Sequence, residues 1–270
     1  MAAIRPMIRS VRAAASDGLA VQEVQYDHGV KMGPHAHREL SLTMVLCGAL
    51  QECVGSKGRA EPAAFAIGVK PFGVEHSNEF APTGTRLISV TVAKSWYDRL
   101  EERVPALDDW RWVGAGPAVA TFLNLLQHLR HDPTALNTWL EATVIDLIAA
   151  FGADARLGRT GHAPVWLSHV RQRLLEEVCP GVQTTTLARE AGVHPVSLAR
   201  AFRRHYGESI SEWVRRARLL RAARLLSDTQ LPLPVVALEA GLADQSHLSR
   251  LCRQEAGVTP AALRRLQTKA

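Results

Sequence analysis

The spacing of apolar positions changes along the chain and separates a β-rich part from a helical part. Up to residue 93, short apolar or alternating runs at 20–26, 40–46, 65–69 and 86–92 are separated by turn-forming residues at 55–58 and 82–84. Short strands broken by Gly and Pro are typical of a compact antiparallel β-barrel or sandwich. We therefore predict a β-barrel domain over residues 1–93.

A helical period begins after residue 93. Two apolar stripes follow the spacing of a helix face, and the helix-breaking sequence at 131–133 separates them. The stripes are Val119, Phe122, Leu123, Leu126 and Leu129, and then Leu140, Val144, Leu147, Ile148 and Phe151. We predict a helical segment over 94–155. Because two stripes exceed what one barrel edge needs, we expect a homodimer through 117–151; the alternative is that both stripes pack on the barrel.

The stretch 152–163 holds three glycines and few apolar residues, a composition typical of linkers. We place the linker at 156–163 and a second domain at 164–270. A length of 270 residues agrees with more than one domain.

Charge is divided unevenly between the two parts of the chain. Residues 1–162 hold 16 Lys and Arg against 17 Asp and Glu, whereas residues 163–270 hold 16 against 9. The net charge of +6 therefore comes from the last part, where 15 of the 16 cations are arginine. An excess of positive charge on one domain is expected of a module that binds a polyanion such as nucleic acid.

Composition excludes several other classes of protein. A content of 47% hydrophobic and 21% charged residues is ordinary for a globular protein. No apolar run approaches the ~18 residues of a membrane-spanning helix, and the N-terminal sequence lacks the apolar run of a secretory signal. The four cysteines are Cys47, Cys53, Cys179 and Cys252, and their spacing matches neither CxxC nor a disulfide framework. We expect a cytoplasmic protein with reduced thiols and no membrane contact.

The second domain contains an internal repeat. The pattern Leu187-Ala188-x-x-Ala191-Gly192 recurs 49 residues later as Val236-Ala237-x-x-Ala240-Gly241. An apolar i,i+4 pair follows each copy, Leu198 with Phe202 and Leu248 with Cys252. Each copy predicts a helix, a glycine turn and a second helix, which is a helix-turn-helix motif. A long amphipathic helix predicted at 209–226 joins the copies, so two reading helices about one DNA turn (~34 Å) apart are expected.

At these residues the chain resembles the AraC/XylS family of bacterial transcription regulators over 164–266. The likeness is carried by TLAREAGVHPVSLARAFRRHYGESISEWVRRARLLRAARLL and VVALEAGLADQSHLSRLCRQEAGVTPAALRR. The family usually has aromatic residues where this chain has Leu242 and Cys252. Both remain apolar, so we expect a smaller core with the packing intact. The resemblance implies double-stranded DNA as a partner and, if the protein activates transcription, RNA polymerase as another.

The side chains opposite each apolar pair are predicted to face DNA. They are Val196, Ser197, Ala199, Arg200, Arg203, Arg204, Gln245, Ser246, Ser249, Arg250 and Arg253. Arg200 is expected to read guanine and Gln245 adenine, while Arg250 suits guanine or phosphate. The arginines one turn further on are expected to hold phosphates without reading sequence.

The N-terminal domain carries a pattern of histidines. His35, His37 and Glu39 alternate as residues on one face of a strand do, and His76 follows later. The spacing resembles the two short motifs of the cupin barrel, which AraC/XylS regulators commonly use to bind an effector. We predict that these four residues bind a small, unidentified effector. They are also the candidate ligands of a divalent metal, but Glu39 lies closer to His37 than in metal-binding cupins, so we expect no metal and no other cofactor.

The predicted fold class is α+β multidomain, with an N-terminal cupin-like β-barrel, a helical extension, and a C-terminal all-α domain holding two helix-turn-helix motifs. The predicted function is a sequence-specific DNA-binding transcription regulator controlled by a small effector, with no enzymatic activity. The alternative is a metal-dependent cupin enzyme fused to a DNA-binding domain. Sensing explains both halves with one mechanism, and neither a Gly-rich phosphate loop nor a nucleophile elbow is visible in the sequence.

Overall fold

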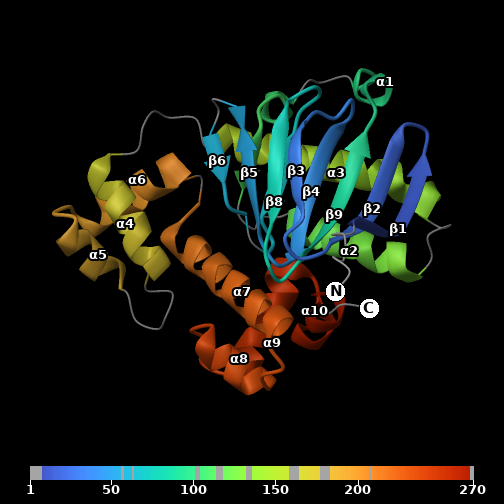
Figure 1. The fold of residues 1–270 in the computed structure, drawn as a ribbon. Coiled ribbons are helices and arrows are strands. Elements are labelled where there is room, and N and C mark those ends of the chain that lie inside the picture. Colours follow the sequence, from blue (N-terminus) through green and yellow to red (C-terminus); the bar gives the residue numbers. More distant parts are fainter. Residues whose placement is uncertain are drawn as a thin grey trace. The chain divides into compact units, whose positions relative to one another are not determined.

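The computed structural model describes residues 8–55, 58–62, 64–100, 104–113, 118–131, 136–157, 164–176, 183–206 and 208–267. The chain divides into two compact units, one formed by Met1–Phe151 with Arg264–Ala270 and the other by Gly152–Leu263. The predicted α+β class, with strands in the first part and helices in the second, is confirmed (Figure 1). Among the described helices, none combines the length and apolar character needed to cross a membrane.

Two antiparallel sheets form the first unit. The six-stranded sheet has the order β1 (Ile8–Ser16), β2 (Leu19–Tyr26), β9 (Thr85–Val92), β4 (Leu40–Cys47), β7 (Ile67–Lys70) and β10 (Arg111–Val113). The four-stranded sheet has the order β3 (Lys31–His35), β8 (His76–Phe80), β5 (Leu50–Val54) and β6 (Gly58–Ala60). The four apolar runs of the sequence correspond to β2, β4, β7 and β9, which all lie in the six-stranded sheet.

The barrel continues beyond residue 93, where the sequence placed its end. Strand β10 pairs antiparallel with β7, and Trp112 lies opposite Gly68. A Cβ atom on Gly68 would lie 2.9 Å from the indole of Trp112, so glycine is needed for this close packing. A three-residue strand is too short to leave a period in the sequence, and tertiary pairing alone defines it.

The two faces of the six-stranded sheet differ in polarity. On the inner face, Val45 and Leu87 pack with Leu50 and Phe80 of the other sheet. Further along the same face of β4 the side chains become polar. The hydroxyl of Thr43 lies 3.1 Å from that of Ser41 and 2.9 Å from that of Ser89. The space between the two sheets therefore holds a buried polar region beside an apolar cluster.

The outer face of the sheet is apolar and carries helices α2 (Ala118–His131) and α3 (Leu136–Leu157), which Figure 1 shows behind the strands. Its buried residues include Leu40, Leu42, Met44, Ile88 and Val90. Helix α2 is attached to this face through Arg130, whose Nε donates to the carboxylate of Glu23 at 3.1 Å. The Glu23 side chain is fully buried and also meets Arg12 and Arg86, so three guanidinium groups surround one buried carboxylate.

The apolar stripes of α2 and α3 are used within the chain itself. All ten predicted stripe residues are buried, and Leu126, Leu129, Val144 and Leu147 have no exposed surface. Over residues 118–131 and 140–151, Ile145 is the one exposed large apolar side chain. The stripes thus pack on the sheet, which was the alternative interpretation, and they provide no reason to expect a homodimer through 117–151.

Helix α3 also ends later than the linker prediction required. It continues to Leu157, so residues 156 and 157 are helical rather than linker, and 158–163 lie outside the described residues. The short helices α1 (Lys94–Tyr97) and η2 (Pro105–Leu107) complete the first unit. The side chain of Gln267, near the end of the chain, donates to the carbonyl oxygen of Leu46 at 2.8 Å, so the last residues belong to this unit.

The second unit is all-helical. It contains α4 (Val165–Glu176), α5 (Thr184–Glu190), α6 (Pro195–Tyr206), α7 (Ile210–Asp228), α8 (Leu233–Glu239), α9 (Gln245–Ala256) and the start of α10 (Pro260–Gln267). The sequence pattern had not identified α4, which contributes Leu167, Val170 and Leu174 to the core around α5 and α6.

Helix α7 links the two repeats, as predicted. Its start is fixed by a capping box, in which the Ser209 hydroxyl accepts from the Glu212 N–H at 3.2 Å and the Glu212 carboxylate accepts from the Ser209 N–H at 2.7 Å. Its first turns bury Ile210 and Trp213 in the core of the first repeat. Its later turns contact α8 and α9 instead. One helix therefore contributes different turns to the two repeats.

Candidate functional site

The two helix-turn-helix repeats have the same backbone geometry at the turn. In the first, the N–H groups of Ala191, Gly192 and Val193 donate to the carbonyls of Leu187, Arg189 and Ala188 at 3.0, 3.1 and 2.9 Å. In the second, the N–H groups of Ala240, Gly241 and Leu242 donate to those of Val236, Leu238 and Ala237, each at 2.9 Å. The turn glycines have φ of +67° and +79°, a conformation that side chains disfavour.

The first recognition helix, α6, separates buried and exposed side chains cleanly. Leu198 and Phe202 are completely buried in the core of the repeat. The predicted DNA-facing residues of this helix are all exposed, namely Val196, Ser197, Ala199, Arg200, Arg203 and Arg204. The helix starts with Pro195, and the ring Nδ1 of His194 accepts from the N–H of Val196 at 3.3 Å. Sequence reasoning had not assigned His194 a role.

The second recognition helix, α9, has the same arrangement with a different start. The carboxylate of Asp244 accepts from the N–H of His247 at 2.7 Å and caps the helix. Leu248, Leu251 and Cys252 are buried, and burial raises the pKa of the Cys252 thiol to about 12. Cys252 is therefore a small packing residue and not a reactive one. The predicted DNA-facing residues Gln245, Ser246, Arg250 and Arg253 are exposed, and Ser249 is half-buried.

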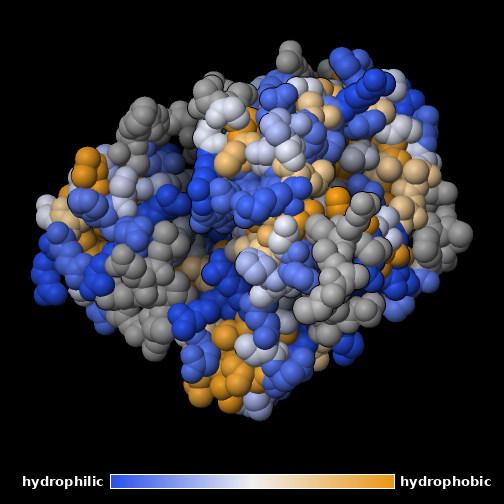
Figure 2. Space-filling model, viewed as in Figure 1, coloured by the Kyte–Doolittle hydropathy of each residue, from blue (hydrophilic) through white to orange (hydrophobic). Residues whose placement is uncertain are grey.

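Figure 2 shows that the visible surface of the second unit is mainly hydrophilic, with an apolar patch over α8. The exposed large apolar residues of α8 are Leu238 and Val235, 62% and 37% exposed. The recognition helices contribute mostly polar and cationic side chains outside their cores.

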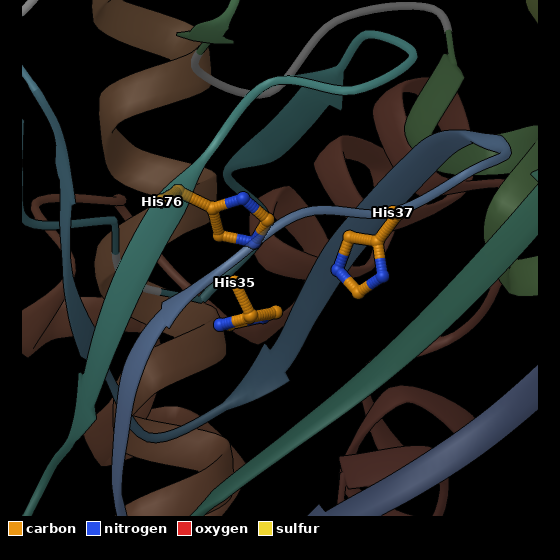
Figure 3. A group of neighbouring side chains, drawn as sticks. All are labelled: His35, His37 and His76. Atoms are coloured by element: carbon orange, nitrogen blue, oxygen red, sulfur yellow. The ribbon is translucent and has the colours of Figure 1, made fainter.

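Three histidines meet inside the first unit (Figure 3). His35 ends β3 and lies opposite His76 of β8 in the strand register. His37 follows in the loop, where its carbonyl accepts from the N–H of Gly73 at 2.9 Å. The ring centroids are 4.4 Å apart for His35 and His76, 5.0 Å for His37 and His76, and 5.1 Å for His35 and His37.

The fourth predicted member, Glu39, does not join this group. The sequence interpretation assumed a strand through 35–39, but β3 ends at His35 and Glu39 lies exposed in the following bend. A carboxylate in water is well solvated, so nothing favours its turning inward. It is close enough to His37 to act on its charge, and it opposes the lowering of that pKa.

The surroundings of His37 and His76 favour the neutral form of both imidazoles. Burial, followed by the neighbouring His76 and the Lys70 ammonium, lowers the pKa of His37 to about 4. Burial and then Lys70 also lower the pKa of His76. Both side chains are therefore uncharged at neutral pH.

A buried ion pair beside the histidines escaped the sequence analysis. The Lys70 ammonium lies 3.0 Å from the Glu52 carboxylate, and both residues are buried. Glu52 also accepts from the indole N–H of Trp110 at 2.6 Å. The only signal in the sequence was a lysine that directly follows an apolar strand, because Glu52 resembles any exposed acid.

Comparison with known proteins assigns the family. A family model described as "Helix-turn-helix domain" matches residues 187–266. The "HTH-type transcriptional regulator GlxA" of Rhizobium meliloti is 38% identical over 81 residues, which are 30% of this chain and 25% of that protein. The "Probable transcription factor PqrA" of Proteus vulgaris is 31% identical over 84 residues, which are 31% of this chain and 69% of that protein.

Among solved structures, the DNA-binding domain of AdpA in complex with a target DNA has 29% sequence identity and a TM-score of 0.35, and the match covers 37% of this chain and 89% of that one. The chain spans a quarter of the length of GlxA, so likeness to that protein is confined to the helix-turn-helix region. These two relatives are named as a transcriptional regulator and a transcription factor. The duplicated motif and these matches together show that the chain belongs to the AraC/XylS family of transcription regulators.

Proposed function

We propose that this regulator reads double-stranded DNA with α6 and α9 and is controlled by a small effector bound in the barrel. The observation that carries the DNA proposal is the repeated turn, because identical backbone hydrogen bonds support two exposed recognition helices. The predicted net charge of the second domain adds attraction to phosphates. We place the protein in the cytoplasm, where bacterial DNA lies. If it activates transcription, RNA polymerase is a further partner.

The effector proposal rests on the polar interior of the barrel. His35, His37 and His76 turn toward one another there, and the Glu52–Lys70 pair lies in the same interior. Buried polar groups at this density are typical of a binding site, since each must otherwise find an internal partner. Glu39 lies outside the group and takes a secondary role, acting on the charge of His37.

A binding-site selection tests the DNA proposal. Arg200 is exposed in the middle of α6 and is assigned to guanine, whereas Arg203 is assigned to phosphate. Arg200→Ala should cost about 1–3 kcal/mol on the selected site and flatten the preference at one base pair. Arg203→Ala should weaken binding to all sequences alike and lower the salt slope by about one.

The matched control is Arg224→Ala, which removes the same charge from an exposed position on α7 outside the recognition helices. It should leave the selected sequence unchanged. Unchanged base preferences in Arg200→Ala would show that Arg200 holds the backbone. Absence of any salt-dependent DNA binding by the parent chain would remove the DNA proposal altogether.

A further inference from the structure

The histidine group has the geometry of a ligand set and not merely of packed rings. One ligand atom from each of His35, His37 and His76 lies within 4.8 Å of the other two. Small rotations about side-chain bonds bring three such nitrogens to one central ion. Figure 3 shows that the rings come from two neighbouring strands and the loop after one of them, so the backbone holds all three together.

In two of the rings, Nδ1 is held by a hydrogen bond to a backbone carbonyl. His35 Nδ1 lies 2.8 Å from the carbonyl oxygen of Gly33, and His76 Nδ1 lies 3.0 Å from that of Val74. A carbonyl oxygen only accepts, so Nδ1 carries the proton in both rings and Nε2 has a free lone pair. Histidines that bind metals almost always donate their other N–H in this way, which sets the tautomer and the ring orientation.

The lone pair of His76 is left without a donor. His76 is 2% exposed, and its Nε2 atom is buried with no hydrogen-bond partner among the described residues. Most buried polar atoms in folded proteins have a partner, so this atom calls for an explanation. A ligand that accepts electron pairs from nitrogen provides one, whereas simple packing leaves it unexplained.

The charge nearby does not forbid a cation. Lys70 is the cationic side chain that acts on both His37 and His76, but its ammonium is paired with Glu52 at 3.0 Å. The pair carries no net charge, and exposed Glu39 adds a negative charge near His37. His37 and His76 therefore offer neutral nitrogens beside an ion pair that carries no net charge.

We propose that His35, His37 and His76 bind one divalent first-row transition-metal ion, such as Zn²⁺, Co²⁺ or Ni²⁺. Imidazole nitrogen suits these ions, and three protein ligands leave a coordination position open. This replaces the expectation of no metal, which rested on the spacing of Glu39, because the structure assembles the ligand set without that residue. The inference deepens the proposed effector site and rests on the same residues.

The test uses the full-length chain, stripped with EDTA, dialysed, and titrated with Co²⁺ while its visible absorption is recorded. We expect one equivalent of Co²⁺ to bind, with intense d–d bands, and to be displaced by Zn²⁺. His35→Ala and His37→Ala should each weaken Co²⁺ binding by more than about 100-fold, because loss of a ligand should exceed the 10–100-fold cost of losing its hydrogen-bond partner.

A matched variant keeps the test specific. His28→Ala removes an exposed histidine from the turn before β3. It should keep one equivalent and change the affinity by less than about threefold. Circular dichroism checks that His35→Ala and His37→Ala are folded. If they are not, metal analysis of the native chain after incubation with Zn²⁺ and desalting decides the question: one equivalent supports the site, and less than about 0.2 overturns it.

DNA binding by the same samples separates this inference from the proposed function. A native chain that binds DNA but takes up no stoichiometric metal overturns the metal site and leaves the DNA-binding function standing. A chain that binds one metal ion, lost in His37→Ala, supports the metal site even if no DNA is bound. Equal Co²⁺ affinity in His37→Ala and His28→Ala would also overturn the site.

Discussion

The two units of this chain differ in where their polar and charged side chains lie. Every buried polar or charged side chain found among the described residues belongs to the first unit, including Glu52, Lys70, His76 and Asn78 inside the barrel. The second unit has an apolar interior, for example Leu198, Phe202 and Trp213, and its arginines between residues 164 and 263 whose side chains are described are at least partly exposed. The first unit therefore has its candidate binding groups in the interior, whereas the second has them on the surface.

This difference matches the size of what each unit is proposed to bind. DNA is a polymer that can meet only an outer surface, so cations and a rigid helix face are sufficient. A small effector or a metal ion is enclosed, and enclosing it requires polar groups in the interior. Ion pairs and hydroxyl contacts satisfy several of those groups when no ligand is present, whereas His76 Nε2 has no hydrogen-bond partner among the described residues.

The largest effect is expected from a charge placed in the apolar layer of the first unit. Leu126 has no exposed surface, so Leu126→Glu buries an unpaired carboxylate and should cost more than about 4 kcal/mol of unfolding free energy. Ile145→Glu, on the exposed side of α3 at 45% exposure, should stay within about 0.5 kcal/mol. Urea denaturation followed by circular dichroism measures both. Equal stability of the two variants would mean that the stripe is free and would restore the homodimer interpretation.

The buried Glu52–Lys70 pair of the first unit can be compared with an exposed ion pair of the second. Lys70→Met leaves the fully buried Glu52 carboxylate without its cation and should cost about 3–5 kcal/mol. Adding Glu52→Gln to it should recover most of that loss. In the second unit, Arg215→Met breaks a pair with Glu255 at 3.5 Å, in which both side chains are at least 30% exposed. That change should cost less than about 1 kcal/mol. Similar losses in both units, measured by urea denaturation, would contradict the contrast.

Acid should destabilise the metal-free barrel gradually. The pKa of His37 is about 4 in the folded chain against 6.5 in a free side chain, and that of His76 is also lowered. The unfolded chain therefore binds protons more readily between these values, and the stability is present above pH 6.5 and lost as the pH falls toward 4. His37→Gln should flatten this dependence. Unfolding of the EDTA-treated chain at a series of pH values tests it, and an equally steep profile in the variant would exclude His37 as the cause.

The smallest expected effect tests the repeated turn. Gly192 has φ of +67°, and a methyl group at its Cα would meet no atom within 4 Å, so Gly192→Ala should cost only backbone strain, about 1–2 kcal/mol. Gly192→Asn should lose less, because asparagine tolerates this conformation. Thermal unfolding compares the two. If alanine is as stable as glycine, the turn does not depend on the left-handed conformation.

Local patterns in the sequence were sufficient for much of the architecture. Strands β2, β4, β7 and β9 and the helices of both repeats were found because each shows a regular period of apolar residues. The two turns were found because glycine allows a positive φ that other residues resist. The exposure of the predicted DNA-facing residues agrees with that period, and their contacts with DNA remain predictions.

Only the tertiary structure decided which strands pair and which buried side chains contact one another. Strands β3, β5, β6 and β8 are short and partly polar, so their pairing is set by neighbours and not by their own pattern. His35 faces His76 through a register between distant segments, while Glu39 stays outside because the strand ends four residues earlier. The Glu52–Lys70 pair and the covered stripes of α2 and α3 have the same origin. A sequence period shows which side chains favour burial, but the partner of each buried group depends on contacts between residues far apart in the chain.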